Sequence, residues 1–134
     1  MTANTIAHLC KQHDAMLQTM QRMRLAMLAG DITSARAARD ALHALQAEHI
    51  AAEESDLISR LGTSARWSAK VYLAEHAKLA AMTEEWRARL ERLPAHTVEP
   101  ERRLALLDAS LPLQHLLEHH FEREEKGLFV EIAG

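Results

Sequence analysis

Cysteine, proline, glycine and aromatic residues are all scarce in this chain of 134 residues. The single cysteine, Cys10, excludes an internal disulfide bond and a zinc site built from thiolates. No segment contains the roughly 18 consecutive apolar residues that a membrane-spanning helix requires. The N-terminal segment MTANTIAHLCKQHD also lacks the uncharged apolar run of a signal peptide, so we expect a cytoplasmic protein.

The chain also lacks a strong excess of one charge. Its formal net charge is −3 at pH 7, and acidic and basic residues are interspersed along it. A nucleic-acid-binding surface or a polybasic membrane anchor would need clustered basic residues. We therefore expect neither nucleic acid nor a membrane as a partner.

The sequence is instead rich in Ala, Leu, Met, Arg and Glu, which favour α-helices. In four segments, apolar residues and several histidines recur at spacings of three and four, the pattern of a helix with one buried face. The predicted inward-facing residues are Ile6, Leu9, His13, Met16, Met20, Met23 and Met27 in the first segment; Leu42, Leu45, His49, Ala52, Glu53 and Asp56 in the second; Tyr72, His76, Leu79, Thr83, Trp86, Leu90 and Leu93 in the third; and Leu113, Leu116, Leu117, His120, Glu124 and Leu128 in the fourth.

Turn-forming residues separate the first three segments. Gly30 is a helix terminator, and Asp31 can cap the second helix. The second helix should stop near Gly62, after which Thr63 or Ser64 can cap the third.

Prolines punctuate the last part of the chain. The range Pro94–Pro100 predicts a loop, with Pro100 in the first turn of the fourth helix. Pro112 predicts either a kink in that helix or a restart after Ser110. Four helices joined by short connections predict an all-α protein: one domain over residues 1–134, folded as an antiparallel up-down-up-down four-helix bundle.

Histidines and glutamates occupy inward positions of all four predicted helices. The pairs His49/Glu53 and His120/Glu124 are each four residues apart, so each pair shares a helix face. Residue counts from the turns, at about 1.5 Å per residue, put the four inward histidines at one level of the bundle. Burying these groups without cations would cost several kcal/mol for each unpaired charge, and a bound metal removes that cost. The candidate metal ligands are His13, His49, Glu53, His76, His120 and Glu124.

Imidazole and carboxylate ligands suit iron or manganese. A carboxylate can bridge two metals, so a dinuclear site uses two carboxylates and four histidines more economically than a mononuclear one. The ferritin-like di-iron pattern requires Glu-x-x-His on two helices, and no glutamate of this chain has a histidine three residues later.

Four stretches of the sequence, KQHDAML, EHIAAEESDLI, YLAEHAKL and EHHFEREEKGLF, together resemble the hemerythrin-like (HHE cation-binding) family. Members of that family carry His, His-x-x-x-Glu, His and His-x-x-x-Glu in this order on an antiparallel four-helix bundle, and the resemblance covers essentially the whole chain. It implies a non-haem di-iron centre with the four histidines as terminal ligands and Glu53 and Glu124 as bridges. It further implies a small partner molecule (oxygen, nitric oxide or peroxide) and a role in sensing, detoxification or iron handling, for a ligand-binding protein rather than a dedicated enzyme.

One position departs from the family pattern. Respiratory hemerythrins have a fifth histidine one helical turn from the ligand on the third helix, where this chain has Tyr72 on one side of His76 and Ala80 on the other. Tyr72 can be a phenolate ligand in a sixth position, a hydrogen-bond donor behind the ligands, or a core aromatic. Because reversible oxygen carriage depends on the full histidine set, the departure favours peroxide, nitric oxide or redox chemistry.

An alternative function is a helical interaction module without redox chemistry, which is metal-free or holds zinc.

The remaining histidines, glutamates and tryptophans have simpler interpretations. We expect His8, His43, His96, His115 and His119 on the surface or in loops. We expect Glu54, Glu122 and Glu125 to be solvated or to support the ligands, and Trp67 and Trp86 to pack near the ends of the third helix.

Overall fold

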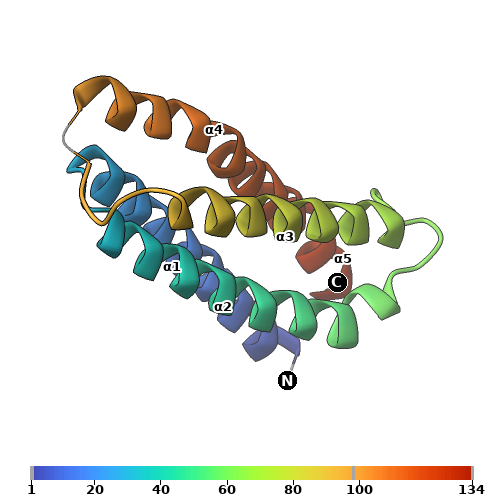
Figure 1. Cartoon of the computed structure of the whole chain (residues 1–134). Helices are drawn as coiled ribbons and strands as arrows, with labels where there is room; N and C mark the ends of the chain where they lie inside the picture. The colour runs from blue at the N-terminus through green and yellow to red at the C-terminus, as the bar shows by residue number, and fades with distance from the viewer. Residues whose placement is uncertain (1, 98, 134) are drawn as a thin grey trace.

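A computed structural model describes residues 2–97 and 99–133 (Figure 1). No β-strand occurs within these two ranges, and the chain is all-helical. The elements are α1 (Thr2–Leu28), α2 (Ile32–Asp56), the 3-10 turn η1 (Ile58–Arg60), α3 (Ala69–Glu91), α4 (Pro100–Arg123), the π-helical turn η2 (Glu124–Leu128) and α5 (Phe129–Ala133).

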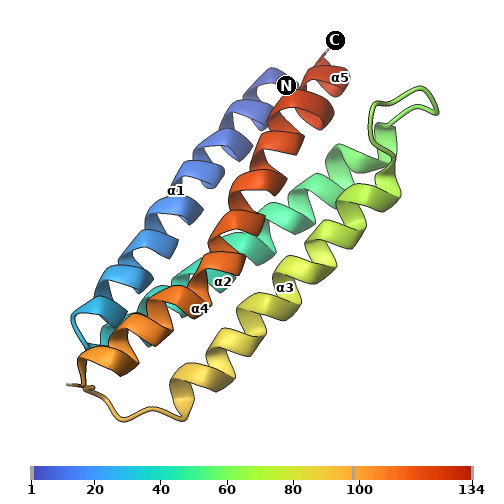
Figure 2. The same cartoon turned by 90° about the horizontal axis from the view of Figure 1, so that it is seen from above.

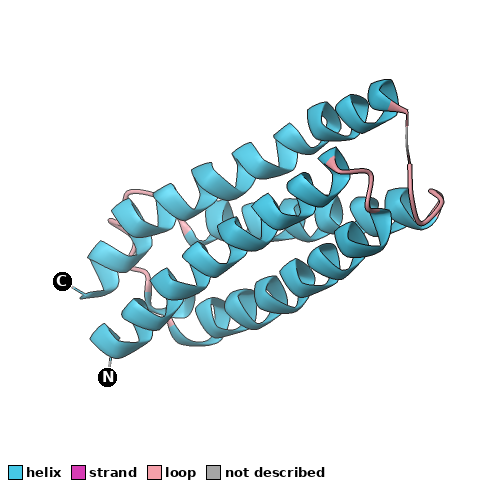
Figure 3. Cartoon of the chain, turned by 90° about the vertical axis from the view of Figure 1, so that its left-hand side faces the viewer, coloured by secondary structure: helices cyan, strands magenta, loops and turns pink. Residues whose placement is uncertain are grey.

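The four long helices form the predicted four-helix bundle. Helix α1 packs against α2 and α4, and α3 packs against α2 and α4, which closes a ring of four neighbours. Successive helices run in opposite directions, and both chain ends lie at the same end of the bundle (Figures 2 and 3). No described helix has the length and hydropathy needed to cross a membrane.

Two apolar clusters fill the interior. The larger one lies toward the end of the bundle where α1 joins α2, and it contains the methionine row of α1. The smaller one lies at the end with the termini, and includes Leu9, Tyr72 and Leu128. His13 falls between Leu9 of the smaller cluster and Met16 of the larger one. A buried polar layer therefore divides an apolar core.

Local rules account for the connection between α1 and α2. Gly30 adopts φ +75°, and a Cβ there would lie 2.0 Å from the Thr97 carbonyl oxygen, so only glycine fits. The Thr97 amide donates to the Gly30 carbonyl over 2.9 Å, which ties this turn to the α3–α4 connection. Asp31 caps α2 by accepting from the Ser34 amide at 3.0 Å, as predicted.

The start of α3 differs from the prediction. The helix begins at Ala69, after Ser68, so neither Thr63 nor Ser64 caps it. The intervening loop is held from elsewhere in the chain, because the Arg66 amide donates to the Glu131 side chain at 2.8 Å. A contact between residues so distant in sequence leaves no local signal.

The buried face of α2 also differs in part. Asp56 is exposed and Leu45 and Ala52 are only half-buried, whereas Arg39 and Gln46 are buried. Arg39 can be buried because its guanidinium donates to Asp40 and to the Thr83 carbonyl. Because polar residues occupy inward positions of α2, the pattern of apolar residues alone does not predict its buried face completely.

Helix α4 begins at Pro100, as predicted, and continues through Pro112 without a restart after Ser110. Pro112 cannot donate to the carbonyl of Asp108, but both residues are exposed. Water can therefore hydrate that carbonyl, and the helix tolerates the proline.

Candidate metal centre

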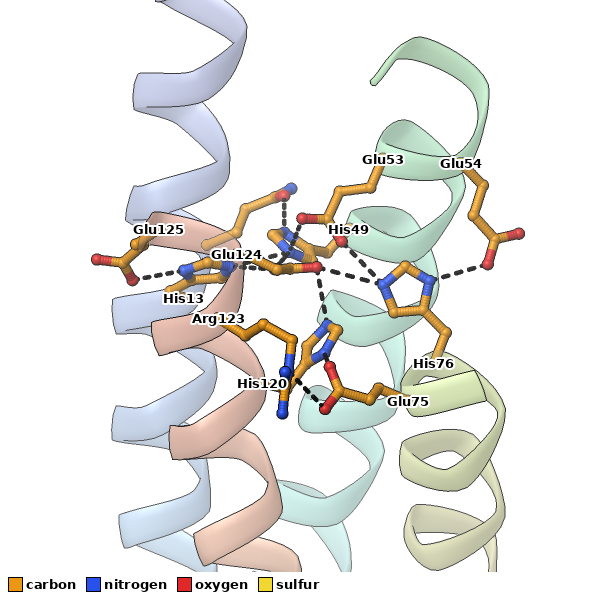
Figure 4. A network of polar contacts seen from close by, with 11 residues as sticks. His13, His49, Glu53, Glu54, Glu75, His76, His120, Arg123, Glu124 and Glu125 are labelled. Carbon is orange, nitrogen blue, oxygen red and sulfur yellow. Dashed lines mark hydrogen bonds and ion pairs between the residues drawn. The ribbon is translucent and has the colours of Figure 1, made fainter. Parts of the chain in front are cut away.

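Six buried side chains from the four helices and η2 meet in the polar layer between the apolar clusters (Figure 4). None of them is more than 3% exposed. They are His13 from α1, His49 and Glu53 from α2, His76 from α3, His120 from α4 and Glu124 from the first residue of η2. These are the six residues that the sequence predicts, and the structure brings all of them together.

Glu124 lies at the centre of the four imidazoles. Its Oε1 is 2.8 Å from Nε2 of His13 and 3.3 Å from Nε2 of His49. Its Oε2 is 3.3 Å from Nε2 of His76 and 2.8 Å from Nε2 of His120. One carboxylate oxygen thus faces the histidines of α1 and α2, and the other faces those of α3 and α4.

Glu53 divides its two oxygens in the same way. Its Oε2 lies 3.1 Å from Nε2 of His49, and its Oε1 lies 3.0 Å from Nε2 of His76. The layer consequently contains two groups of four residues able to hold a metal ion, and both groups include Glu53 and Glu124. We call the group completed by His13 and His49 the α1–α2 position, and the group completed by His76 and His120 the α3–α4 position.

Several inward-facing atoms lack good hydrogen bonds. The Nε2 atoms of His13 and His49 face each other at 3.1 Å, so one of them must carry a proton for any favourable contact. Glu53 Oε2 and His120 Nε2 are buried without a hydrogen bond of acceptable geometry, although each lies close to an oppositely charged group. Buried groups left in this way cost free energy. A cation among the nitrogens and oxygens would satisfy them, so the donor set fits a metal.

The outer nitrogen of each histidine donates to a side chain on the neighbouring helix. The four Nδ1 contacts are His13 to Glu125 at 2.8 Å, His49 to Gln12 at 2.8 Å, His76 to Glu54 at 2.9 Å and His120 to Glu75 at 2.8 Å. An acceptor at Nδ1 holds the ring in one orientation and leaves Nε2 free to bind a metal, the usual arrangement around metal-binding histidines.

These acceptors follow a rule of position. Each acceptor is the sequence neighbour of a candidate ligand, but it accepts a hydrogen bond from the histidine of an adjacent helix. An acceptor in α1 binds the histidine of α2, one in α2 binds that of α3, one in α3 binds that of α4, and one in η2 binds that of α1. The expectation for Glu54 and Glu125 is confirmed. Gln12 and Glu75 were not predicted, and their only signal in the sequence is their place beside His13 and His76.

Without a metal, the carboxylates favour the protonated forms of His49, His76 and His120. Burial by itself would lower the pKa of His49, but its contacts with Glu124 and Glu53 outweigh burial and raise the pKa to about 9. The same balance raises the pKa of His76 to about 10 and also raises that of His120. A metal must displace these protons, since only a neutral imidazole can bind it.

The two central carboxyls titrate in opposite directions. Burial would raise the pKa of Glu124, but the four surrounding histidines hold it well below its usual range. Burial raises the pKa of Glu53, and the neighbouring Glu124 adds to this effect. Glu124 is therefore the more strongly ionised member of the pair.

Tyr72 lies in the smaller apolar cluster, and its side chain is fully buried. Its hydroxyl is near the Leu128 backbone but makes no hydrogen bond of acceptable geometry. Burial, followed by the charge of Glu131, raises the pKa of Tyr72 to about 12.

Aromatic rings and surface groups complete the surroundings. Phe121, which the sequence did not single out, stacks on His13 with ring centroids 4.0 Å apart. Arg123 donates to Glu75 at 3.0 Å and lies over Trp67.

Several predictions for single residues away from the site are confirmed. Trp86 is buried in the core, and Glu122 is exposed and paired with Lys126. The exposed histidines are His8, His43, His96, His115 and His119.

The chain matches no protein-family model, no curated protein and no solved structure.

Proposed function

We propose that this chain is a non-haem di-iron-binding protein that binds or reacts with oxygen, nitric oxide or peroxide in sensing, detoxification or iron handling. The observation that carries this proposal is the sharing of Glu53 and Glu124 between two ligand groups. Each carboxylate presents one oxygen to each group, which is what a bridge between two metals requires. The resemblance to the hemerythrin-like family supports iron as the metal.

The residues of the chain would hold the metals, and bound iron would supply a redox-active Lewis acid for the small ligand. His13 and His49 would be terminal ligands at one position, and His76 and His120 at the other. The Nδ1 acceptors hold these rings with Nε2 facing the two positions.

Burial restricts what can reach the centre. The ligand side chains are at most 3% exposed, and Phe121 covers one face of His13. A substrate larger than a diatomic molecule or peroxide would have to displace core side chains. This restriction favours a metal- and ligand-binding protein over an enzyme with an organic substrate. We propose that this protein acts in the cytoplasm, as the sequence leads us to expect.

A second candidate is a helical interaction module that is metal-free or holds zinc. One observation favours the metal-free form: the raised pKa values of His49 and His76 let imidazolium groups balance the carboxylates of Glu53 and Glu124 with no metal present. Such a protein would be colourless, whereas a di-iron protein absorbs in the near-ultraviolet and visible.

Elemental analysis and absorption spectroscopy separate these candidates. Protein produced with ample iron and reconstituted in air should contain about two iron atoms per chain, because two carboxylates serve two metals. Glu124→Gln should lose most of this iron, whereas Glu122→Gln, two residues away on the surface, should keep it. Iron at one equivalent or less in the unaltered protein, or a colourless protein with zinc, would contradict the proposal.

A further inference from the structure

The Nδ1 acceptors of the two metal positions are not equivalent. Both histidines of the α3–α4 position donate to a carboxylate, His76 to Glu54 and His120 to Glu75. In the α1–α2 position only His13 donates to a carboxylate, because His49 donates to the neutral amide oxygen of Gln12.

The surroundings of these acceptors add to the difference. Glu75 is only 17% exposed and is held by Arg123, which lies over the Trp67 ring at 4.7 Å. Glu125, the one carboxylate behind the α1–α2 position, is 50% exposed, and Glu54 behind the α3–α4 position is 41% exposed, so Glu75 is the one of the three carboxylates that is well shielded from water. Water and salt weaken the electrostatic influence of an exposed carboxylate, and an exposed side chain holds its partner less firmly.

A carboxylate at Nδ1 makes an imidazole a stronger donor to a metal than an amide does, because negative charge is shared across the hydrogen bond. Glu53 and Glu124 serve both positions and do not distinguish them. We propose that the α3–α4 position binds the first metal ion and holds it more tightly, and that Gln12 is the positioning residue that keeps the α1–α2 position weaker. This inference rests on the proposed dinuclear site.

The test must separate unequal positions from simple repulsion between two bound cations, which would also give two binding steps. Variants that disable one position do this. His13→Ala leaves the α3–α4 position, and His76→Ala leaves the α1–α2 position. We expect His13→Ala to bind its remaining ion about 10- to 100-fold more tightly than His76→Ala, the range seen when such acceptors are changed. The probe is Co²⁺ added without oxygen to metal-free protein, followed by its visible absorption.

Second substitutions then identify the cause. In the His76→Ala protein, Gln12→Glu should raise the Co²⁺ affinity of the α1–α2 position. In the His13→Ala protein, Glu75→Gln should lower that of the α3–α4 position, and this variant adds no buried charge. Glu122→Gln is the matched control and should change neither affinity, since Glu122 is exposed and pairs with Lys126. Circular dichroism of each metal-free variant checks that the helices remain intact.

Equal Co²⁺ affinities of the two single-position variants would overturn the inference, as would a Glu75→Gln variant that binds as tightly as its parent. Two ions bound by the unaltered protein, together with equal positions, would leave the proposed function standing. Absence of any Co²⁺ or iron binding by the unaltered protein would remove the proposed function and this inference together.

Discussion

At the scale of single residues, His119 and His120 are adjacent in the chain but have different environments. His119 is exposed, whereas His120 is 1% exposed and has its Nε2 2.8 Å from Glu124 Oε2. Neighbouring residues of a helix point about 100° apart, so only one of the two can share the face of Glu124. The residue four positions after His119 is Arg123, a cation that cannot bind a metal.

His120→Ala should therefore halve or abolish the iron content of the reconstituted protein, and His119→Ala should leave it unchanged. Iron per chain, measured after removal of unbound metal, checks this prediction. The reverse pattern would mean that the helical register of α4, and the site built on it, is wrong.

A second prediction at this scale concerns whether Tyr72 binds iron. A phenolate bound to ferric iron produces a broad visible charge-transfer band. Because the Tyr72 hydroxyl lies against Gly127 in the smaller apolar cluster, and burial also raises its pKa to about 12, we expect Tyr72 not to bind iron and Tyr72→Phe to leave the visible spectrum of the iron-loaded protein unchanged. A visible band that disappears in Tyr72→Phe would instead make Tyr72 a ligand.

At the scale of elements, the π-helical turn η2 shapes the end of α4. The turn starts at Glu124, whose amide donates to the carbonyls of both His120 and Phe121. Three consecutive residues that follow, Gly127, Leu128 and Phe129, are buried. π-Helical turns are frequent at functional sites, and this one directs Glu124 to the centre and Glu125 to His13.

Gly127 lets this turn pack closely against α3 and the preceding loop. A Cβ at position 127 would lie 2.6 Å from the Trp67 ring and 2.7 Å from the Tyr72 hydroxyl. Gly127→Ala should lower the free energy of unfolding by about 1–3 kcal/mol, the usual cost of overpacking, although alanine by itself favours helices by about 0.5–1 kcal/mol. Thermal melting of the metal-free protein measures the change.

Gly62→Ala is the control for this prediction, because a Cβ at position 62 meets nothing within 4 Å. Its melting temperature should stay close to that of the unaltered protein. An equally stable Gly127→Ala variant would show that Trp67 moves aside easily and that the turn is not tightly packed.

At the scale of the whole molecule, protons and metal compete for one buried layer. The pKa values of His49 and His76 are about 9 and about 10 in the folded metal-free protein, above the ordinary histidine value of 6.5. Groups with a raised folded pKa stabilise the fold fully below the unfolded value, and this contribution is lost as the pH rises through the folded value. The metal-free protein should therefore lose melting temperature between about pH 6.5 and pH 10.

The iron-loaded protein should respond to pH in the opposite direction. Metal binding requires neutral imidazoles, so affinity rises with pH, and the stabilisation due to bound iron grows with it. Protons begin to compete with iron as the pH falls through about 10 and 9, the pKa values of His76 and His49 in the metal-free fold, so iron should be released progressively as the solution is acidified. Melting curves of both forms across this range check the prediction, and parallel curves for the two forms would contradict a metal bound by these histidines.

Residue spacing along the chain is enough to predict most of the fold and the six members of the candidate site. The 3–4 periodicity of α1 and α3 predicted their buried faces, and the four-residue spacing of His49/Glu53 and His120/Glu124 predicted shared helix faces. These features follow from the geometry of one helix, which depends only on the order of residues within it.

The way in which the helices face one another follows from the packed bundle and not from the spacing of residues. The tertiary structure showed that each oxygen of Glu53 and Glu124 serves a different histidine pair, and that Gln12 and Glu75 support histidines on neighbouring helices. It also showed that α3 starts later than predicted, at Ala69, and that a π-helical turn begins at Glu124. These features depend on the relative rotation and height of separate helices. The packing of the whole core sets both quantities, and no local spacing encodes them.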